Sequence, residues 1–166
     1  LTLLNQKSTL KIKNVGLNPT RIGFYEILKK QKASIKFLNL KKENNEIRGD
    51  IFVKNCKLKA IRASKKYYVN STDEYPILFV LAALTKGVSK FSGISDLANK
   101  ESNRIIEMKK ILDQLNIKSK LNKDQFKIYG QGLIDASDKK INVPNLGDHR
   151  ICMSCFVLAL LTGAKT

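Results

Sequence analysis

The stretch Leu81–Ile94, LAALTKGVSKFSGI, occurs in related form at two other places in the chain. The related stretches are LTLLNQKSTLKIKNV, which starts at Leu1, and LALLTGAKT, which starts at Leu158, so the copies begin about 80 residues apart. Each copy has the pattern of the end of an apolar helix, followed by a short turn and a strand. A repeat of this length indicates a fold built from copies of one supersecondary unit.

The segments between these copies repeat as well. An arginine opens each of two helical patterns, RIGFYEILKKQKASIKF from Arg21 and RIIEMKKILDQLNIKSKL from Arg104, and both place apolar residues on one face. Each predicted helix leads into a strand, a polar turn and a second strand, which is typical of a hairpin. We expect the turns at residues 41–46 and 122–125 and the second strands at residues 50–53 and 126–129.

Two apolar runs of helix length complete the repeat. They are EYPILFVLAAL after Asp73 and HRICMSCFVLALL after Asp148, and because both are apolar on all faces we expect helices that are buried on all sides. Pro76 suits the first turn of the earlier helix, and the two aspartates suit the N-cap position. The predicted unit is therefore strand, amphipathic helix, strand, strand, strand and buried helix.

This pattern predicts an α/β fold of repeated βαβ-type units. The first unit covers approximately residues 9–86, the second covers residues 87–162, and residues 163–166 would begin a further unit. We expect residues 1–166 to form part of one domain that is truncated at both ends, because the sequence starts with a helix-like pattern and stops in a strand-like one.

The composition excludes several classes of protein. With 166 residues, of which 43% are apolar, the chain is long enough for a real core and is not a disordered polymer. No run reaches the roughly 18 apolar residues that span a bilayer, and the first residues lack the basic leader and cleavage site of a signal peptide. We expect no membrane partner.

The three cysteines are Cys56, Cys152 and Cys155. The last two form a CxxC inside an apolar run, but a zinc site would need a second pair of ligands and the chain has one histidine. We therefore expect no metal and interpret both as buried core thiols. An odd number of cysteines without a secretory leader favours a reducing compartment, which predicts a cytoplasmic protein.

The net charge of +17, from 31 basic and 14 acidic residues, favours an anionic partner. Most of the basic residues are lysines scattered along the chain, and the aromatic content of 7% includes no stacking cluster for nucleic acid. We interpret most of this charge as solvated surface, which is compatible with small phosphorylated substrates. A basic, non-catalytic module that binds nucleic acid is an alternative that the charge alone favours.

Three of the five arginines, Arg21, Arg104 and Arg150, stand at the start of predicted helices. A cation there opposes the helix dipole at a cost of a few tenths to about 1 kcal/mol, so arginine at these positions indicates a geometric need. Its planar fork binds a carboxylate or phosphate through two hydrogen bonds, and helix starts offer free amide donors. Salt bridges to Asp148 and Glu101 are the alternative for a single arginine, whereas three repeated positions favour anion sites.

Four motifs occur in order: NPTRIG at 18–23, DEYP at 73–76, KESNR at 100–104 and GDHR at 147–150. Together with GDIFVKNCKLKAI from Gly49, they resemble the 5-enolpyruvylshikimate-3-phosphate synthase family over nearly the whole chain. The resemblance implies the enolpyruvyl transferase fold of two similar domains, each an inside-out α/β barrel of three repeated units around buried parallel helices. This chain would be most of the domain that carries the C-terminal half, and the active site would lie in the cleft between the domains.

The resemblance also implies a transferase activity. The enolpyruvyl group of phosphoenolpyruvate passes to the 5-hydroxyl of shikimate 3-phosphate and phosphate is released, in the shikimate pathway of aromatic amino acid and chorismate biosynthesis. No metal or organic cofactor is implied, the two substrates are the expected partners, and the complete enzyme is expected to be a monomer. Because the family's N-terminal lysine and serine motif, its other domain and its C-terminal lysine segment are missing, we expect this fragment to be inactive alone.

The matching motifs imply a role for each site residue. Asp73 matches the carboxylate that contacts the shikimate hydroxyl and helps to remove its proton, and Lys100 matches a lysine near the same substrate. Glu101 matches the acid that protonates the methylene carbon of phosphoenolpyruvate. Arg104 and Arg150 match the arginines that hold phosphoenolpyruvate through its carboxylate and phosphate.

Four further positions lie in or near the motifs that carry the resemblance. His149 lies beside the phosphoenolpyruvate arginines and is an additional candidate, whereas Arg21 belongs to a family motif and is expected to be structural. The family usually has aspartate at the position of Asn103 and often arginine at the position of Ala98. Asn103 can still cap a helix, but it brings no charge to orient Arg104.

A related transferase that acts on UDP-N-acetylglucosamine shares the fold and the phosphoenolpyruvate chemistry and is the other alternative. The motifs KESNR and GDHR favour shikimate 3-phosphate. We therefore expect a shikimate phosphate substrate and no nucleic acid partner.

Overall fold

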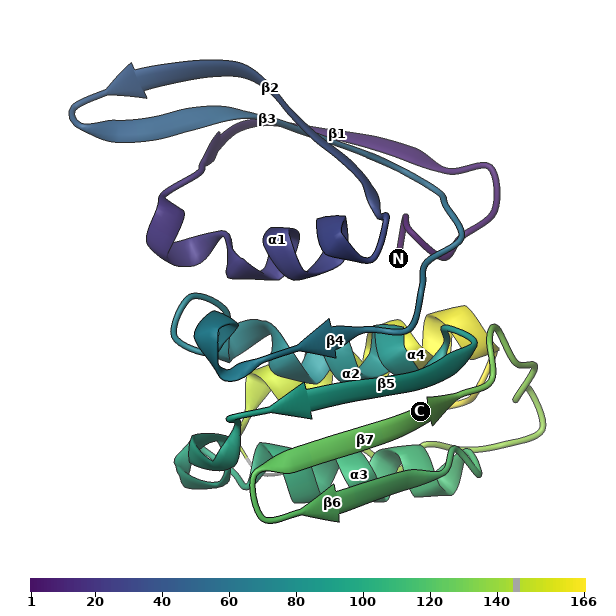
Figure 1. The fold of residues 1–166 in the computed structure, drawn as a ribbon. Coiled ribbons are helices and arrows are strands. Elements are labelled where there is room, and N and C mark those ends of the chain that lie inside the picture. Colours follow the sequence, from purple (N-terminus) through teal and green to yellow (C-terminus); the bar gives the residue numbers. More distant parts are fainter. Residues whose placement is uncertain (145–146) are drawn as a thin grey trace.

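The N-terminal part of the chain forms a three-stranded sheet with one helix beneath it (Figure 1). The computed structural model describes residues 1–144 and 147–166. The sheet is antiparallel with the order β1-β3-β2, so that β3 is its central strand. The elements of this upper layer are β1 (Thr9–Gly16), α1 (Gly23–Lys30), β2 (Ser34–Glu43) and β3 (Glu46–Lys54).

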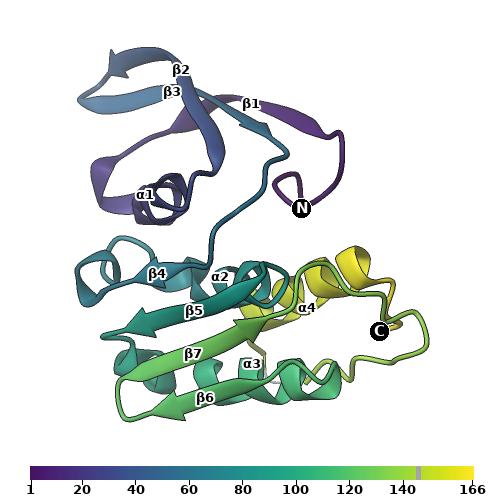
Figure 2. The same cartoon turned by 45° about the vertical axis from the view of Figure 1, so that its right-hand side comes forward.

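The rest of the chain forms the lower layer, a four-stranded sheet with the order β4-β5-β7-β6. Strands β4 and β5 pair in parallel and the other pairs are antiparallel. Figures 1 and 2 show α2, α3 and α4 together behind this sheet, while no described helix covers its opposite face. The elements are β4 (Arg62–Ala63), α2 (Tyr75–Ala83), β5 (Gly87–Ser92), α3 (Arg104–Gln114), β6 (Ser119–Asn122), β7 (Gln125–Gly130) and α4 (His149–Thr162).

The order of the elements agrees with the predicted unit, and both hairpins and all four helices form where the patterns indicate. The parallel pairing of β4 with β5 recurs near the end of the chain as a single bridge between Lys140 and Lys165. Helix α1 begins at Gly23 rather than at the arginine, because Pro19–Arg21 form the short 3-10 helix η1. Leu1–Asn5, expected to be the end of a helix, form one hydrogen-bonded turn.

Helix α2 is the centre of the core. The ring of Phe79 packs edge-on against Phe91 and Phe126, with ring centroids 4.9 and 5.0 Å apart, and all three side chains are fully buried. Full burial of one such ring stabilises the fold by about 1.5–3 kcal/mol. Gly130 on β7 lies against the end of this helix, where an added Cβ would be 1.9 Å from the carbonyl oxygen of Thr85, so the position requires glycine.

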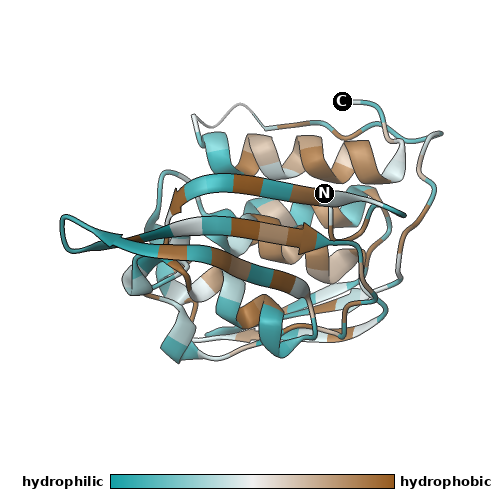
Figure 3. Ribbon diagram, turned by 90° about the horizontal axis from the view of Figure 1, so that it is seen from above, coloured by the Kyte–Doolittle hydropathy of each residue, from teal (hydrophilic) through white to brown (hydrophobic). Residues whose placement is uncertain are grey.

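The prediction of two fully buried helices is confirmed for α2 and wrong for α4. Pro76 lies in the first turn of α2 as predicted. On α4, however, Met153, Phe156 and Leu160 are 57%, 52% and 72% exposed, and Figure 3 shows hydrophobic residues in brown along this helix. One side of α4 packs on α2 and α3, and no described segment covers the other side. A helix that is apolar all round needs partners on both sides, and this chain provides one.

Asp50 joins the two outer strands of the upper sheet to its central strand. Strands β1 and β2 each shift register where they pass β3, and Asn14 and Asn39 adopt positive φ angles of 52° and 51° there. The carboxylate of Asp50 accepts a hydrogen bond from the backbone N–H of Asn14 at 3.1 Å and from Nδ2 of Asn39 at 2.8 Å. Lys11 Nζ lies 3.0 Å from the same group. One carboxylate therefore stabilises both irregular sites.

The described helices include none that is long and apolar enough to cross a membrane. All three cysteines are free. Cys155 is buried, and burial raises the pKa of its thiol to about 12, whereas Cys152 is partly exposed. The interpretation as buried thiols is thus confirmed for Cys155 and holds only in part for Cys152. In the described ranges, no group of three or more His, Cys, Asp or Glu side chains could hold a metal ion.

Candidate active site

The predicted site residues lie at the starts of three helices in the lower layer. Asp73 lies in the short 3-10 helix η3 (Thr72–Glu74) that precedes α2, Arg104 opens α3, and Asp148 directly precedes α4. Arg104 contacts both aspartates, which brings together segments that are far apart in the sequence. The fold therefore gathers three of the four motifs in one cluster.

Arg104 is the centre of this cluster, and its side chain has no exposed surface. Its Nε donates to Asp148 Oδ2 at 2.9 Å, and its Nη1 donates to Asp73 Oδ1 at 3.4 Å. Its Nη2 donates to a carboxylate oxygen of Glu101. A buried guanidinium group is stable only where carboxylates and hydrogen bonds replace its lost hydration. The three carboxylates supply this replacement.

Asp148 is buried and contacts two helices. Its Oδ1 accepts hydrogen bonds from the backbone N–H groups of Arg150 and Ile151 at 3.1 and 3.4 Å, which confirms it as the N-cap of α4. Its Oδ2 accepts from Arg104 and from Ser102 Oγ, each at 2.9 Å. Burial acts against the charge of Asp148, but the hydrogen bonds from Arg104 and Ser102 outweigh it and lower the pKa of this carboxyl. One carboxylate therefore fixes the start of α4 relative to α3.

Arg150 extends from the start of α4 to Asp73. Its Nη2 donates to Asp73 Oδ2 at 2.5 Å, and its Nη1 lies 2.6 Å from His149 Nε2. Partial burial acts against the charge of Asp73, but Arg150 and Arg104 outweigh it and lower the pKa of this carboxyl. The Nε of Arg150 is buried and has no hydrogen-bond partner among the described residues. The cluster thus keeps one donor that its own residues do not use.

Lys100 stands apart from these ion pairs. Its Nζ lies 2.8 Å from Asp96 Oδ2, which also accepts a hydrogen bond from Tyr68 Oη at 2.9 Å. The structure therefore places Lys100 beside the cluster without bringing it into contact with the two arginines.

One expectation about helix starts is wrong. Asp73 does not cap α2, because its carboxylate turns to the two arginines, and Glu74 stands at the N-cap position without a side-chain cap. Glu101 pairs with the guanidinium group of Arg104 at the start of α3. Asn103 caps α3, as its side-chain oxygen accepts from the N–H of Ile106 at 3.2 Å.

An open pocket of about 490 Å³ borders the cluster. Asp73 and Arg150 form its polar side together with Arg21, and residues of α2 and α4 form its apolar side. Burial, helped by the nearby charge of Asp73, raises the pKa of Glu74 in the same wall. A pocket with two guanidinium groups and two carboxyl groups can hold a small, multiply charged anion and exchange protons with it.

Sequence reasoning identifies most of the cluster but misses two of its links. It gives Asp148 a cap and a salt bridge to Arg150 but not its pairing with Arg104, and it gives Ser102 no role, although both lie inside the motifs KESNR and GDHR. The salt-bridge alternative is confirmed for Arg104 with Glu101. It is wrong for Arg150 with Asp148, because the guanidinium of Arg150 reaches a carboxylate from another segment.

The fold and the cluster define a class of protein: a repeat-built α/β protein with paired arginines and carboxylates at the starts of three helices. A family model described as EPSP synthase (3-phosphoshikimate 1-carboxyvinyltransferase) matches residues 2–166. The chain therefore belongs to the EPSP synthase family, as its four motifs indicate.

Individual relatives agree with this assignment. The 3-phosphoshikimate 1-carboxyvinyltransferase of Carboxydothermus hydrogenoformans is 38% identical over 164 residues, which are 99% of this chain and 37% of the relative. The protein of the same name from Petrotoga mobilis is 36% identical over 159 residues, 96% of this chain and 36% of the relative. A solved EPSP synthase structure from Acinetobacter baumannii matches with a TM-score of 0.84 and 31% identity, over 97% of this chain and 37% of that one. The chain thus spans a little over a third of the length of these relatives.

Proposed function

We propose that the protein to which this chain belongs transfers the enolpyruvyl group from phosphoenolpyruvate to the 5-hydroxyl of shikimate 3-phosphate and releases phosphate. Membership in the EPSP synthase family supports this proposal. The observation that carries it is the buried Arg104, held by three carboxylates beside Arg150, whose Nε has no partner among the described residues. The guanidinium group of Arg150 suits one anionic group of a substrate that bears both a carboxylate and a phosphate, and Arg104 would bind the other by exchanging one of its carboxylates for it.

In this proposal, residues 1–166 form part of one of two domains, with repeat units of approximately 9–86 and 87–162. The second domain would supply the opposite wall of the cleft. Because the chain covers 37% of a relative such as the Carboxydothermus protein, we expect it to be inactive without the rest of the site. Free thiols fit a reducing compartment, so we expect the protein in the cytoplasm.

The proposed reaction has two steps. In the first, Asp73 takes the proton of the hydroxyl group as its oxygen adds to the vinyl carbon, and Glu101 gives a proton to the methylene carbon. In the second, the tetrahedral intermediate loses phosphate, and the Glu101 carboxylate takes a proton from the new methyl group as the double bond forms again. Both steps need an acid and a base within reach. Lys100 would contact shikimate 3-phosphate, and His149 would lie beside the phosphate of phosphoenolpyruvate.

The ion pairs of the cluster suggest how substrate binding activates the base. Asp73 pairs with Arg150, so an anionic substrate that binds Arg150 competes with this carboxylate. Since the two arginines hold the pKa of Asp73 below its usual value, loss of these contacts raises the pKa again. The displaced carboxylate then accepts a proton more readily, which couples substrate binding to removal of the hydroxyl proton.

Phosphate release tests the proposal. Phosphoenolpyruvate would be incubated with shikimate 3-phosphate and either this chain or the complete protein with its flanking coding sequence restored. We expect release only with the complete protein. Release with UDP-N-acetylglucosamine but not with shikimate 3-phosphate would instead identify a sugar-nucleotide transferase, and release with neither acceptor would refute the activity.

A further inference from the structure

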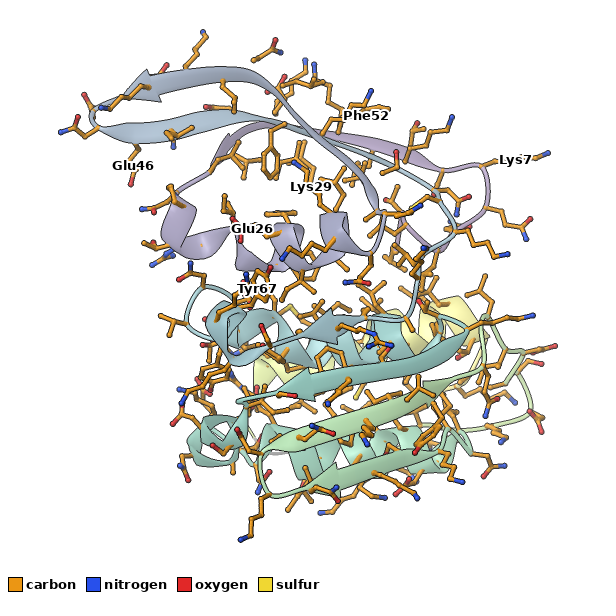
Figure 4. All side chains as sticks on the ribbon, in the orientation of Figure 1. Lys7, Glu26, Lys29, Glu46, Phe52 and Tyr67 are labelled. Carbon is orange, nitrogen blue, oxygen red and sulfur yellow. The ribbon has the colours of Figure 1, made fainter. Side chains whose placement is uncertain are left out.

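A second pocket, of about 300 Å³, lies on another part of the lower layer, where β4 and β5 meet α1. It shares no lining residue with the pocket beside Arg150. Figure 4 labels one of its residues, Tyr67, below α1. We call it the cationic pocket, and the polar residues that define it are Lys30, Arg62, Ser64, Lys66, Lys90 and Ser92.

The cationic pocket concentrates positive charge without acidic partners. No Asp or Glu lines it, and its four cations form none of the ion pairs in the described part of the chain. The ammonium groups of Lys30 and Lys66 lie 5.1 and 5.0 Å from the ring centre of Tyr67, so the ring holds two of them beside the pocket. Glu26, one helical turn before Lys30, does not line the pocket.

The same charge continues across the open face of the lower sheet. Arg62 stands opposite Lys90 in the parallel pair, and Lys90 stands opposite Lys127 in the next pair. Lys127 in turn stands opposite Lys120. Residues directly opposite each other share one face of a sheet, and like charges in such pairs destabilise it. Four strands therefore carry an unfavourable row of cations, which a bound anion would relieve.

We infer that the cationic pocket binds a compact ligand that carries at least two phosphate groups. The fork of Arg62 suits phosphate oxygens, and the hydroxyl groups of Ser64 and Ser92 add uncharged donors at the wall. A diphosphate or triphosphate carries more negative charge than a single phosphate and therefore matches the charge of the four cations better. Tyr67 is 7% exposed and covered by two lysines, so it offers no surface on which a nucleic acid base could stack.

This site lies outside the proposed reaction, and its test uses neither substrate of that reaction. Titration calorimetry on the purified chain would compare inorganic tripolyphosphate, pyrophosphate and orthophosphate at fixed ionic strength. We expect tripolyphosphate to bind more tightly than pyrophosphate, and both to bind more tightly than orthophosphate. Equal binding of all three anions would overturn the inference.

Two matched variants locate the site. The double variant Arg62→Gln/Lys90→Gln removes two charges from the cationic pocket at exposed strand positions, and Lys13→Gln/Lys57→Gln removes two charges elsewhere on the exposed surface. We expect the pocket variant to raise the Kd for tripolyphosphate by about tenfold or more and the control to leave it unchanged. Equal weakening in both variants would show attraction by net charge alone. Tighter binding of single-stranded oligothymidylate than of tripolyphosphate would assign the face to nucleic acid instead.

Discussion

Arg21 and Arg104 occupy equivalent places in the repeat, yet their surroundings differ completely. Arg21 lies just before α1 and Arg104 opens α3, and each of these amphipathic helices leads into a hairpin. Arg104 is fully buried and binds three carboxylates, whereas Arg21 is exposed and forms none of the ion pairs in the described ranges. The repeat therefore determines the backbone path, and the carboxylates around each arginine determine whether its guanidinium group is buried in ion pairs.

Removal of each arginine should show the largest difference. Arg104→Gln leaves a fully buried aspartate without its cation, so we expect a loss of about 3–5 kcal/mol in the free energy of unfolding. Arg21→Gln changes an exposed side chain and should stay within about 0.5 kcal/mol of the parent. Urea denaturation of both variants measures the two values. Similar small losses would mean that Arg104 is not the structural centre of the cluster.

Two carboxylates, Glu101 in the cluster and Glu26 on α1, should differ in their effect on turnover of the complete protein. Glu101→Gln keeps the size of the side chain but removes the proposed proton donor, so we expect turnover to fall by about 10²–10⁴-fold. Glu26→Gln removes one carboxylate from α1 in the upper layer and should leave turnover unchanged. Steady-state phosphate release measures both effects, with circular dichroism as the check of folding. Near-normal turnover of Glu101→Gln would exclude the acid role.

A smaller effect should follow from loss of the Ser102 hydroxyl. Ser102→Ala removes a hydrogen bond to the buried carboxylate of Asp148, and we expect a loss of about 1.5–3 kcal/mol because the acceptor is charged. Ser137→Ala, at an exposed position in the same layer, should cost less than about 0.5 kcal/mol. Equal unfolding midpoints for the two variants would show that the hydroxyl does not support the cluster.

The smallest expected effect concerns a carboxylate of the upper layer at acid pH. In the upper layer, the N–H of Asn14, with Lys11 and Asn39, lowers the pKa of Asp50 to about 2 from 3.8. Its stabilising contribution is complete above the higher value and is lost as the pH falls towards the lower one. Urea unfolding midpoints between pH 5 and pH 2 should therefore fall less steeply for Asp50→Asn than for the parent. Parallel curves would contradict the role of this carboxylate.

The fold was largely predictable because periodicity is a local property. The stripe from Ile105 to Leu115 predicts α3, and the polar turns predict both hairpins. The exposure of α4 was not predictable, because it depends on what lies against the helix and not on the helix sequence. The cap role of Asp73 was wrong for a similar reason, since its partner Arg150 comes from a distant segment. The contacts that define this site join residues that are far apart in the sequence, so local patterns do not reveal them.

The apolar side of α4 has a consequence for the isolated chain during expression. Met153, Phe156 and Leu160 form a stripe of the kind that chaperones and quality-control proteases recognise. A chain that folds with this stripe uncovered is divided among self-association, chaperone binding and degradation. Polar substitutions along this stripe should therefore change the expression yield of the isolated chain.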